Sequence, residues 1–309
     1  MTPLTTASLR GVWGSVLLPI DSGDGIDWDR LGGEVDVLAA SELDGVYAHG
    51  TAGEFHTLSE DEYDRVSAVL AAACARTGKA FQLGASHPVA QVTIERIRRT
   101  RHLSPGAYQV VLPDWLPLTD DEVATFVRRI AKVAAPVPIV LYNPPHAKTS
   151  ATPALLTRLL DAAPSLIGIK VADGDAGWYD SMHAVLERCA VFVPGHRLAT
   201  GMTRGAAGSY SNIAALSPAG AVRWYSLLRD DPAAGLDVER RIATLFDEQI
   251  APLQRRGLSN PALDKFLAAV GEWADVGLRI RWPYDSAPEA AVLPARRRAN
   301  ALLPELFGE

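Results

Sequence analysis

Cysteine is scarce in this chain of 309 residues, and long apolar runs are missing. The two cysteines, Cys74 and Cys189, lie in separate apolar segments without a CxxC spacing. This arrangement argues against a disulfide framework and a structural zinc site, and it fits a reducing compartment. No stretch of about 18 apolar residues occurs, so we expect no transmembrane helix. Because the start also lacks the uninterrupted apolar segment of a signal peptide, the sequence predicts a cytoplasmic protein.

Excess charge of either sign is also small. The formal net charge is -6, from 30 Lys and Arg against 36 Asp and Glu. A mildly acidic chain has no electrostatic reason to bind nucleic acid or an anionic membrane, so neither partner is expected. Hydrophobic residues make up 48% and charged residues 21%, which is typical of a soluble globular protein with a sizeable core.

Short apolar segments alternate with longer amphipathic segments up to about residue 211. The segments predicted as strands are 12–18, 45–48, 81–84, 107–112, 138–142, 166–171, 191–193 and 206–210. Eight strands alternating with helices predict an α/β fold of the (β/α)₈ type, a TIM barrel. A doubly wound open sheet is the alternative, but no GxGxxG loop follows any of these strands.

Helix signals support this reading. Ser59 with Glu62, and Thr119 with Glu122, have the spacing of capping boxes before amphipathic segments. After Ser217 only helical patterns follow, at 218–228, 237–251, 261–270 and 294–306. We therefore predict a barrel over residues 1–216 and a C-terminal helical extension over 217–309 packed on it.

Barrel active sites form at the carboxyl ends of the strands, so the residues at the end of each strand and just after it are the candidates for the active site. Lys170 is the most informative of them, because it lies in the otherwise apolar segment LIGIKVA at 166–172. With a period of two, Ile167 faces the helices, whereas Gly168 and Lys170 face the interior, where small neighbours leave room for a ligand. Burial lowers the pKa of a lysine and makes its amine nucleophilic. A structural lysine paired with a carboxylate is the alternative.

Two further features suit chemistry at that amine. Tyr142 faces the same interior by the same parity, and a phenol near an amine can carry protons during imine formation. By itself, an inward tyrosine could equally be a core residue. The loop 50–53, Gly-Thr-Ala-Gly, offers backbone N–H groups and one hydroxyl that could hold a carboxylate, although it could also be a tight turn.

Together these features resemble the dihydrodipicolinate synthase and N-acetylneuraminate lyase family of class I aldolases. The motifs that carry the resemblance are GTAGE at 50–54, YNPP at 142–145, IGIK at 167–170 and GAAGSYSN at 205–212. Their order and spacing are more specific than any one motif. The resemblance implies that Lys170 forms a Schiff base, that Tyr142 relays protons with Thr51, and that the substrate is pyruvate or another 2-oxo acid. It also implies a homotetramer built as a dimer of dimers, and no cofactor.

The catalytic residues expected from this resemblance are Lys170, Tyr142 and Thr51. The residues expected to bind the substrate are Gly50, Thr51, Ala52, Asn143, Lys148, His196, Ser209 and Ser211. No metal ligands are expected among them. The predicted activity is that of a lyase that cleaves a carbon–carbon bond or eliminates water.

The chain departs from the synthases of this family at three places. Ala52 stands where they carry a second hydroxyl residue, and Pro113-Asp114-Trp115 stands where they carry a tyrosine shared between subunits. Their substrate-binding arginine aligns with Ala147, and Lys148, one place further on, cannot form its bidentate contact. We therefore expect a different second substrate from that of a true dihydrodipicolinate synthase.

Two alternatives follow from the same residues. His49, His146, His196, Asp114 and Asp173 are all expected at the nominated face. They could form a polar pocket for the hydroxyls of a sugar-acid chain, or they could make the chain a metal-dependent lyase or hydrolase. The other alternative is a family member that binds a 2-oxo acid without turnover, because Ala52, Trp115 and Ala147 replace residues that act in the site of the synthases.

Overall fold

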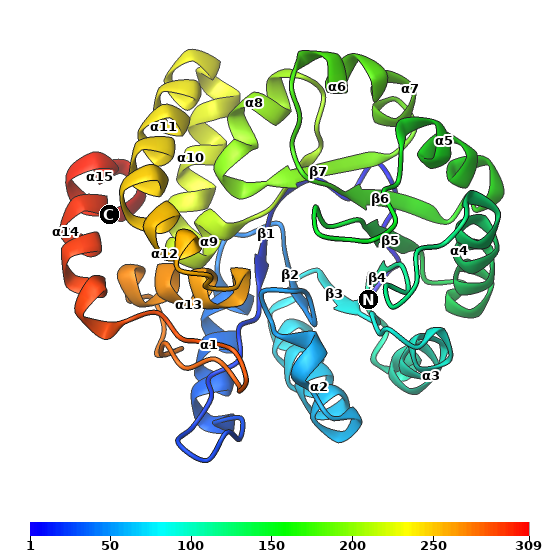
Figure 1. Cartoon of the computed structure of the whole chain (residues 1–309), viewed down its shortest axis with the longest axis horizontal. Coiled ribbons are helices and arrows are strands. Elements are labelled where there is room, and N and C mark those ends of the chain that lie inside the picture. The colour runs from blue at the N-terminus through cyan, green and yellow to red at the C-terminus, as the bar shows by residue number, and fades with distance from the viewer. Residues whose placement is uncertain (309) are drawn as a thin grey trace.

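The computed structural model describes residues 1–308, and its strands form a closed barrel (Figure 1). Neighbouring strands pair in parallel, and pairing between the first and last strands completes the ring. The strands are β1 (Gly11–Ser15), β2 (Gly45–Ala48), β3 (Phe81–Gly84), β4 (Ala107–Val111), β5 (Ile139–Tyr142), β6 (Leu166–Lys170), β7 (Ala190–Pro194) and β8 (Gly208–Tyr210). The predicted (β/α)₈ barrel is confirmed, and β2 and β3 have the bounds expected from the apolar pattern.

Helices separate the strands along the chain and surround the barrel (Figure 1). They are α1 (Trp28–Ala40), α2 (Glu60–Thr77), α3 (Ala90–Thr100), α4 (Asp120–Ala134), α5 (Pro153–Ala162), α6 (Ala176–Ser181), α7 (His183–Leu186) and α8 (Leu198–Thr203). Short 3₁₀ turns are η1 (Phe55–Thr57), η2 (Arg101–Leu103), η3 (Gly195–Arg197) and η5 (Glu289–Ala291).

Both predicted capping boxes are present. At the start of α2, Glu62 N donates to Ser59 Oγ at 3.2 Å and Ser59 N donates to Glu62 Oε2 at 2.9 Å. Thr119 and Glu122 make the same reciprocal pair before α4, at 3.3 and 2.8 Å. These contacts satisfy N–H groups that have no partner within the helix, which fixes where each helix begins.

The C-terminal helices gather on one side of the barrel, next to β1 and away from α3–α7 (Figure 1). They are α9 (Asn212–Leu216), α10 (Pro218–Asp230), α11 (Pro232–Leu245), α12 (Ala251–Arg255), α13 (Asn260–Gly271), α14 (Val292–Leu302) and α15 (Pro304–Phe307). The predicted continuous helix at 237–251 is interrupted by a π-helical turn, η4 (Phe246–Ile250). Pro252 explains the interruption, because its ring would clash with the carbonyl of Glu248 in a regular α-helix. The boundary at 216/217 stays a prediction, since α10 contacts both β1 and α11.

An aromatic cluster fills the barrel interior, with Trp13, Tyr47, Phe192 and Tyr210 packed together. Ile167 belongs to this cluster, so the prediction that it faces the helices is wrong. The physical reason is an irregularity in register, because Ile139 pairs with Leu166 whereas the next residue, Val140, pairs with Gly168. The extra residue breaks the period of two locally, and regular alternation resumes before Lys170.

The space beside Gly168 is filled by protein. A Cβ atom at this glycine would lie 2.5 Å from Leu9 Cδ2 and 3.2 Å from Val140 Cγ2. Leu9, from the segment before β1, thus occupies the room that the sequence reading left for a ligand at Gly168. The open space of the site lies farther toward the strand ends.

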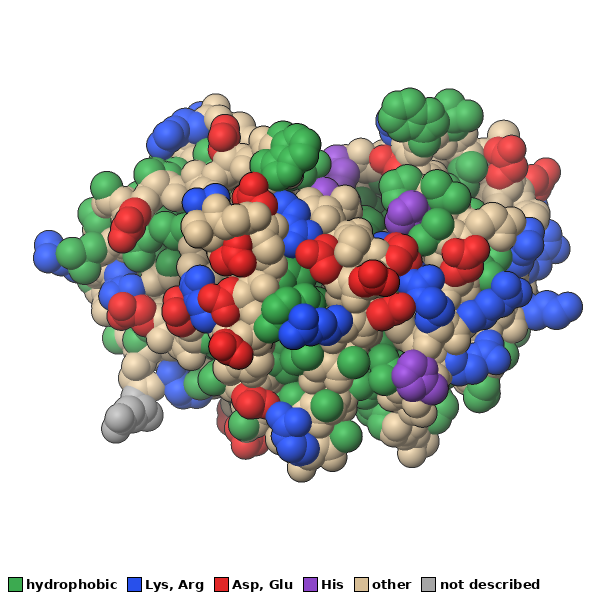
Figure 2. All heavy atoms as spheres, turned by 90° about the horizontal axis from the view of Figure 1, so that it is seen from below, with side chains coloured by type: hydrophobic (Ala, Val, Ile, Leu, Met, Phe, Trp, Pro, Cys, Tyr) green, Lys and Arg blue, Asp and Glu red, His purple; other side chains and the backbone are tan. Residues whose placement is uncertain are grey.

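Side chains of both charges are interspersed over the face seen in Figure 2. Large apolar side chains are also exposed, namely Trp115 (80%), Leu116 (69%) and Trp282 (71%). Within residues 1–308, none of the helices combines the length and apolar character needed to cross a membrane.

Candidate active site

Lys170 ends β6, where its register partners are Tyr142 at the end of β5 and Phe192 in β7. Its amine lies 4.1 Å from the ring centroid of Tyr142, 5.2 Å from that of Tyr210 and 5.3 Å from that of Tyr47. These tyrosines come from three different strands, so the amine lies within the mouth of the barrel. The surrounding ring faces favour a nearby cation weakly, by about 0.5–2 kcal/mol each.

The Lys170 amine makes no hydrogen bond and no ion pair with any of residues 1–308. Burial lowers its pKa to about 8, and the carboxylate of Asp264 on α13 acts in the opposite direction. Burial raises the pKa of Asp264 to about 7, while Lys170 opposes that rise. Since no ion pair joins them within residues 1–308, the two groups interact across the cavity that they line together. A much larger fraction of Lys170 than of an exposed lysine is therefore a neutral, nucleophilic amine near neutral pH.

The tyrosines around Lys170 keep their protons at neutral pH. Burial raises the pKa of Tyr142 to about 12, and a hydrogen bond between its hydroxyl and Thr51 opposes that rise. Burial also raises the pKa of Tyr47 and of Tyr210. Tyr210 donates to Gln82 Oε1 at 2.8 Å inside the barrel. Tyr142 is thus the tyrosine whose hydroxyl is linked to the loop after β2, and it can pass a proton along that link.

A small cavity of about 70 Å³ lies directly at the amine. One water occupies about 30 Å³ of liquid, so this cavity suits a compact polar head group. Its lining consists of Ser15, Tyr47, Thr51, Ala52, Tyr142, Lys170, Tyr210, Ser211, Asn212, Ala215, Asn260 and Asp264. Thr51 and Ala52 of the GTAGE loop both line this cavity, and their binding of a carboxylate stays a prediction.

A larger cavity of about 490 Å³ opens from the same amine toward the C-terminal helices. Its polar lining includes His196, Arg197, Asn212, Asp247, Gln254, Asn260 and Asp264. The π-helical turn η4 contributes Phe246, Asp247 and Ile250, and Phe246 stacks on His196 with ring centroids 5.0 Å apart. A molecule attached to Lys170 could therefore extend from the small cavity into a roomier space rich in hydrogen-bonding groups.

The structure brings six of the predicted site residues to these two cavities, namely Thr51, Ala52, Tyr142, Lys170, His196 and Ser211. Gly50, the first residue of the loop, lines neither cavity, and a Cβ there would come 2.5 Å from the Tyr47 ring. The hydroxyl of Ser211 caps α9 by accepting from Ala214 N at 3.0 Å.

Three predicted substrate-binding residues lie elsewhere. Ser209 is completely buried and lines neither cavity, because in a strand that directs Tyr210 inward its neighbour points to the helices. Asn143 uses its amide to brace the following loop, donating to Thr149 O and accepting from Ala151 N, both at 2.8 Å. Lys148 is exposed and donates to Trp115 O at 3.0 Å. Lys148 thus lines neither cavity around Lys170, and its role in substrate binding stays a prediction.

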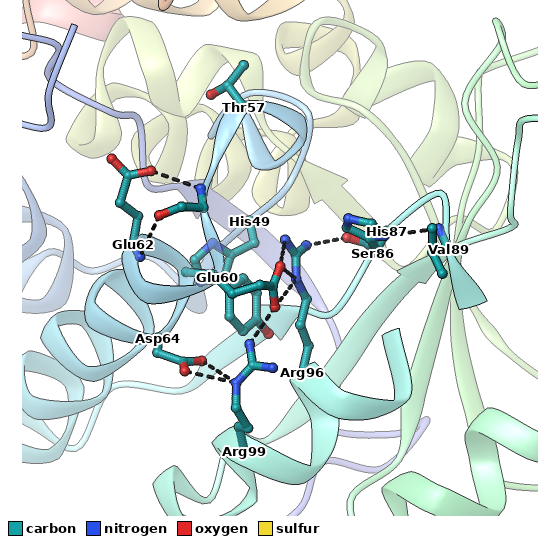
Figure 3. Close-up of polar contacts among 12 residues, drawn as sticks. His49, Thr57, Glu60, Glu62, Asp64, Ser86, His87, Val89, Arg96 and Arg99 are labelled. Carbon is teal, nitrogen blue, oxygen red and sulfur yellow. Dashed lines mark hydrogen bonds and ion pairs between the residues drawn. The ribbon is translucent and has the colours of Figure 1, made fainter. Parts of the chain in front are cut away.

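The histidines expected at the face are dispersed. His49 is buried between β2 and α2, where its Nε2 lies 2.8 Å from Ser67 Oγ and its ring lies 4.1 Å from that of Tyr63. Burial lowers the pKa of His49 to about 3, so it stays neutral. Nearby, Arg96 donates to Ser86 O and to Glu60, and this network joins α2 to α3 (Figure 3).

The remaining members of the expected set are also apart. His146 and Asp114 line a separate cavity of about 450 Å³, whereas His196 lines the large cavity next to Lys170. Asp173 accepts from Tyr179 Oη at 2.5 Å and from Arg197 Nε at 2.8 Å. Within residues 1–308, no three His, Cys, Asp or Glu side chains lie close enough together to hold a metal ion. The geometry gives no support to the metal-dependent alternative.

Sequence reasoning missed several residues of the site. Tyr47 and Tyr210 occupy positions whose side chains point into the barrel, so the alternation of side chains along a strand that identified Lys170 could also have identified them. Asp264 carried a weaker signal, as an acidic residue among apolar ones in the segment PALDKFLAAV at 261–270. No local pattern could show that α13 places it next to Lys170.

Comparison with known proteins gives a consistent result. The chain matches the model of the dihydrodipicolinate synthetase family over residues 8–262. It is 28% identical over 260 residues to N-acetylneuraminate lyase from Rhizobium meliloti, covering 81% of this chain and 82% of that protein. It is 35% identical over 167 residues to 4-hydroxy-tetrahydrodipicolinate synthase from Thermomicrobium roseum, an alignment that spans only 54% of either chain.

Among solved structures, YagE from E. coli K12, a member of the dihydrodipicolinic acid synthase family crystallised with pyruvate, superposes with a TM-score of 0.82. That match is 19% identical and covers 95% of this chain and 98% of the other, so it supports the fold alone. The family match covers most of the chain, the relatives are named as a synthase and a lyase, and both agree with the motifs around Lys170. This chain therefore belongs to the dihydrodipicolinate synthetase family, a family of aldolase-type lyases, as its sequence predicted.

Proposed function

We propose that this protein is a Schiff-base lyase that holds pyruvate or another 2-oxo acid as an imine on Lys170. The observation that carries the proposal is the state of the Lys170 amine. It lies at a cavity, has no hydrogen-bond or ion-pair partner among residues 1–308, and has a pKa lowered to about 8. A structural lysine would be held by a carboxylate, whereas this amine is available to a ligand.

The chemistry follows from the groups in contact with the small cavity. The neutral amine attacks the C2 carbonyl, and Tyr142 passes protons to and from the carbinolamine oxygen so that it can leave as water. Thr51 supports this relay through its hydrogen bond with Tyr142. The N–H groups of Thr51 and Ala52 are suited to bind the substrate carboxylate. The iminium that results from loss of water accepts the electron pair of the bond that breaks at C3, either C3–H or C3–C4.

The large cavity supports a substrate longer than pyruvate, or a second substrate that joins pyruvate at C3. Its amides, its imidazole and its guanidinium can hydrogen-bond the hydroxyls of a polar chain. Whether the bond at C3–C4 forms and breaks by aldol chemistry, or water is eliminated instead, depends on the substrate. A homotetramer and a cytoplasmic location are parts of the same proposal, and light scattering of the purified protein tests the first of them.

Borohydride reduction in the presence of pyruvate tests the imine directly. We expect a reduced pyruvyl adduct on the peptide that contains Lys170, found by mass spectrometry, and no adduct in the Lys170→Arg variant. A wild-type protein that gains no mass under these conditions would refute the imine. An adduct with no turnover across pyruvate–aldehyde pairs and 2-oxo-3-deoxy sugar acids would instead indicate the non-catalytic alternative.

A further inference from the structure

Asp264 occupies the junction of the two cavities around Lys170. Within residues 1–308, the side chains that line both cavities are Tyr142, Lys170, Tyr210, Asn212, Asn260 and Asp264. Asp264 is the only carboxylate among them. Its own carboxylate makes no hydrogen bond with the described part of the chain, although Asp264 is partly buried on α13, beside the buried Lys265.

A carboxylate at this junction faces a particular part of a bound substrate. The carboxylate and C2 of a 2-oxo acid on Lys170 would lie in the small cavity, and the chain beyond C3 would enter the large one. C3 is therefore the carbon that lies where the cavities meet. At that stage the nitrogen of Lys170 is committed to the imine, and the amides of Asn212 and Asn260 cannot titrate. Tyr142 serves the carbinolamine oxygen at C2, so Asp264 is the carboxylate available as a base at C3.

We propose that Asp264 is a catalytic base that removes the C3 proton of a 2-oxo acid bound as an iminium to Lys170. The proposal rests on the imine proposed above. In this step the C3–H bond breaks, its electron pair forms the C2–C3 double bond, and the pair of the C=N bond moves to nitrogen to give a neutral enamine. The proton goes to a carboxylate oxygen of Asp264. In the aldol direction C3 then attacks an aldehyde, and Asp264 returns its proton to the new alkoxide.

The electrostatic surroundings of Asp264 suit this task. Its pKa is raised by burial to about 7, so the carboxylate is a stronger base than an exposed aspartate and still ionises near neutral pH. A general base is most effective when its pKa is close to the working pH. The positive iminium would further favour the ionised carboxylate at the moment when it must accept a proton.

The test uses pyruvate alone, so that no second substrate needs to be known. Wild-type protein in D₂O should replace the methyl protons of pyruvate with deuterium, followed by proton NMR, and borohydride trapping measures the imine in parallel. Above about pH 8, where imine formation has levelled off, we expect Asp264→Asn to trap the imine like the wild type but to exchange methyl protons at least about 100-fold more slowly. Asp264→Glu should restore part of the rate.

A matched control is Asp285→Asn, which removes an exposed carboxylate of the C-terminal segment that lines neither cavity. It should trap and exchange like the wild type. Exchange at the wild-type rate in Asp264→Asn would overturn the assignment and leave Tyr142 as the base. Loss of trapping together with exchange in Asp264→Asn would also overturn it, because Asp264 would then act before the C3 step. If the wild type itself traps no imine, the proposed function fails first, and the inference falls with it.

Discussion

Lys265 Nζ lies 2.6 Å from Glu54 Oε1, and both side chains are completely buried. Glu54 ends the GTAGE loop after β2, and Lys265 follows Asp264 on α13. Arg281 N donates to the other oxygen of Glu54 at 3.0 Å. One buried ion pair thus joins the loop that carries Thr51 to the helix that carries Asp264. It links the barrel part of the site to the C-terminal part.

Breaking this ion pair should destabilise the fold strongly. Removal of one partner leaves a buried charge without compensation, so Glu54→Gln and Lys265→Met should each lower the free energy of unfolding by about 3–5 kcal/mol. The double variant should lose less than the sum of the two, as urea unfolding monitored by circular dichroism would measure. Glu248→Gln, which breaks the exposed pair with Arg298, serves as the control and should change stability little. Additive losses would show that the pair is not coupled.

Glu34 should make stability depend on pH. Burial raises its pKa from 4.5 to about 8; its Oε1 accepts from Leu17 N at 2.6 Å, and its Oε2 has no partner among residues 1–308. A raised pKa means that the folded state holds the proton of Glu34 more tightly than the unfolded state does. The contribution of this bound proton to the free energy of unfolding is therefore fully present below pH 4.5 and is lost as pH rises through about 8.

The variant Glu34→Gln mimics the protonated side chain and removes this loss. It should match the wild type in acid and exceed it above pH 8, by up to a few kcal/mol, because each pKa unit is worth about 1.4 kcal/mol. Chemical unfolding on either side of that pH measures the difference. Equal pH dependence in the two proteins would mean that Glu34 ionises normally in the fold.

Imine formation should follow the protonation of Lys170. The neutral amine is the nucleophile, so the rate of borohydride-trappable adduct formation with pyruvate should rise with pH and level off above about 8. Of the titratable groups around the amine, the buried tyrosines Tyr47, Tyr142 and Tyr210 keep their protons in this range. Asp264 raises the pKa of Lys170, so Asp264→Asn should move the rise to lower pH. A rise displaced to higher pH in that variant would contradict the coupling.

Tyr142→Phe should slow imine formation without preventing it. The phenol transfers protons during formation and collapse of the carbinolamine, a contribution of about 10²–10⁴ in rate. Rapid-quench trapping with pyruvate measures the rate, while long incubation should still give the adduct. Tyr225→Phe is the matched control, because Tyr225 lines neither cavity around Lys170. An unchanged rate in Tyr142→Phe would remove this residue from the relay.

Much of the fold could be predicted because its signals are local. Apolar segments of strand length gave the barrel, and Ser59 with Glu62 fixed the start of α2 through contacts within one turn. The same period of two placed Lys170 and Tyr142 on the inner side of their strands. It failed at Ile167, where an irregularity in register adds a residue that no composition pattern reveals.

The sequence by itself determined the barrel, the family and the pair of Lys170 and Tyr142, since each depends on spacing along a single strand or on motifs read in order. Only the tertiary structure decided which other groups reach that amine. Ser209 and Tyr210 are adjacent in sequence but lie on opposite faces of β8. Asp264 reaches the site because α13 packs beside α9 and is anchored through Lys265, and such docking depends on contacts between segments that are distant in the chain.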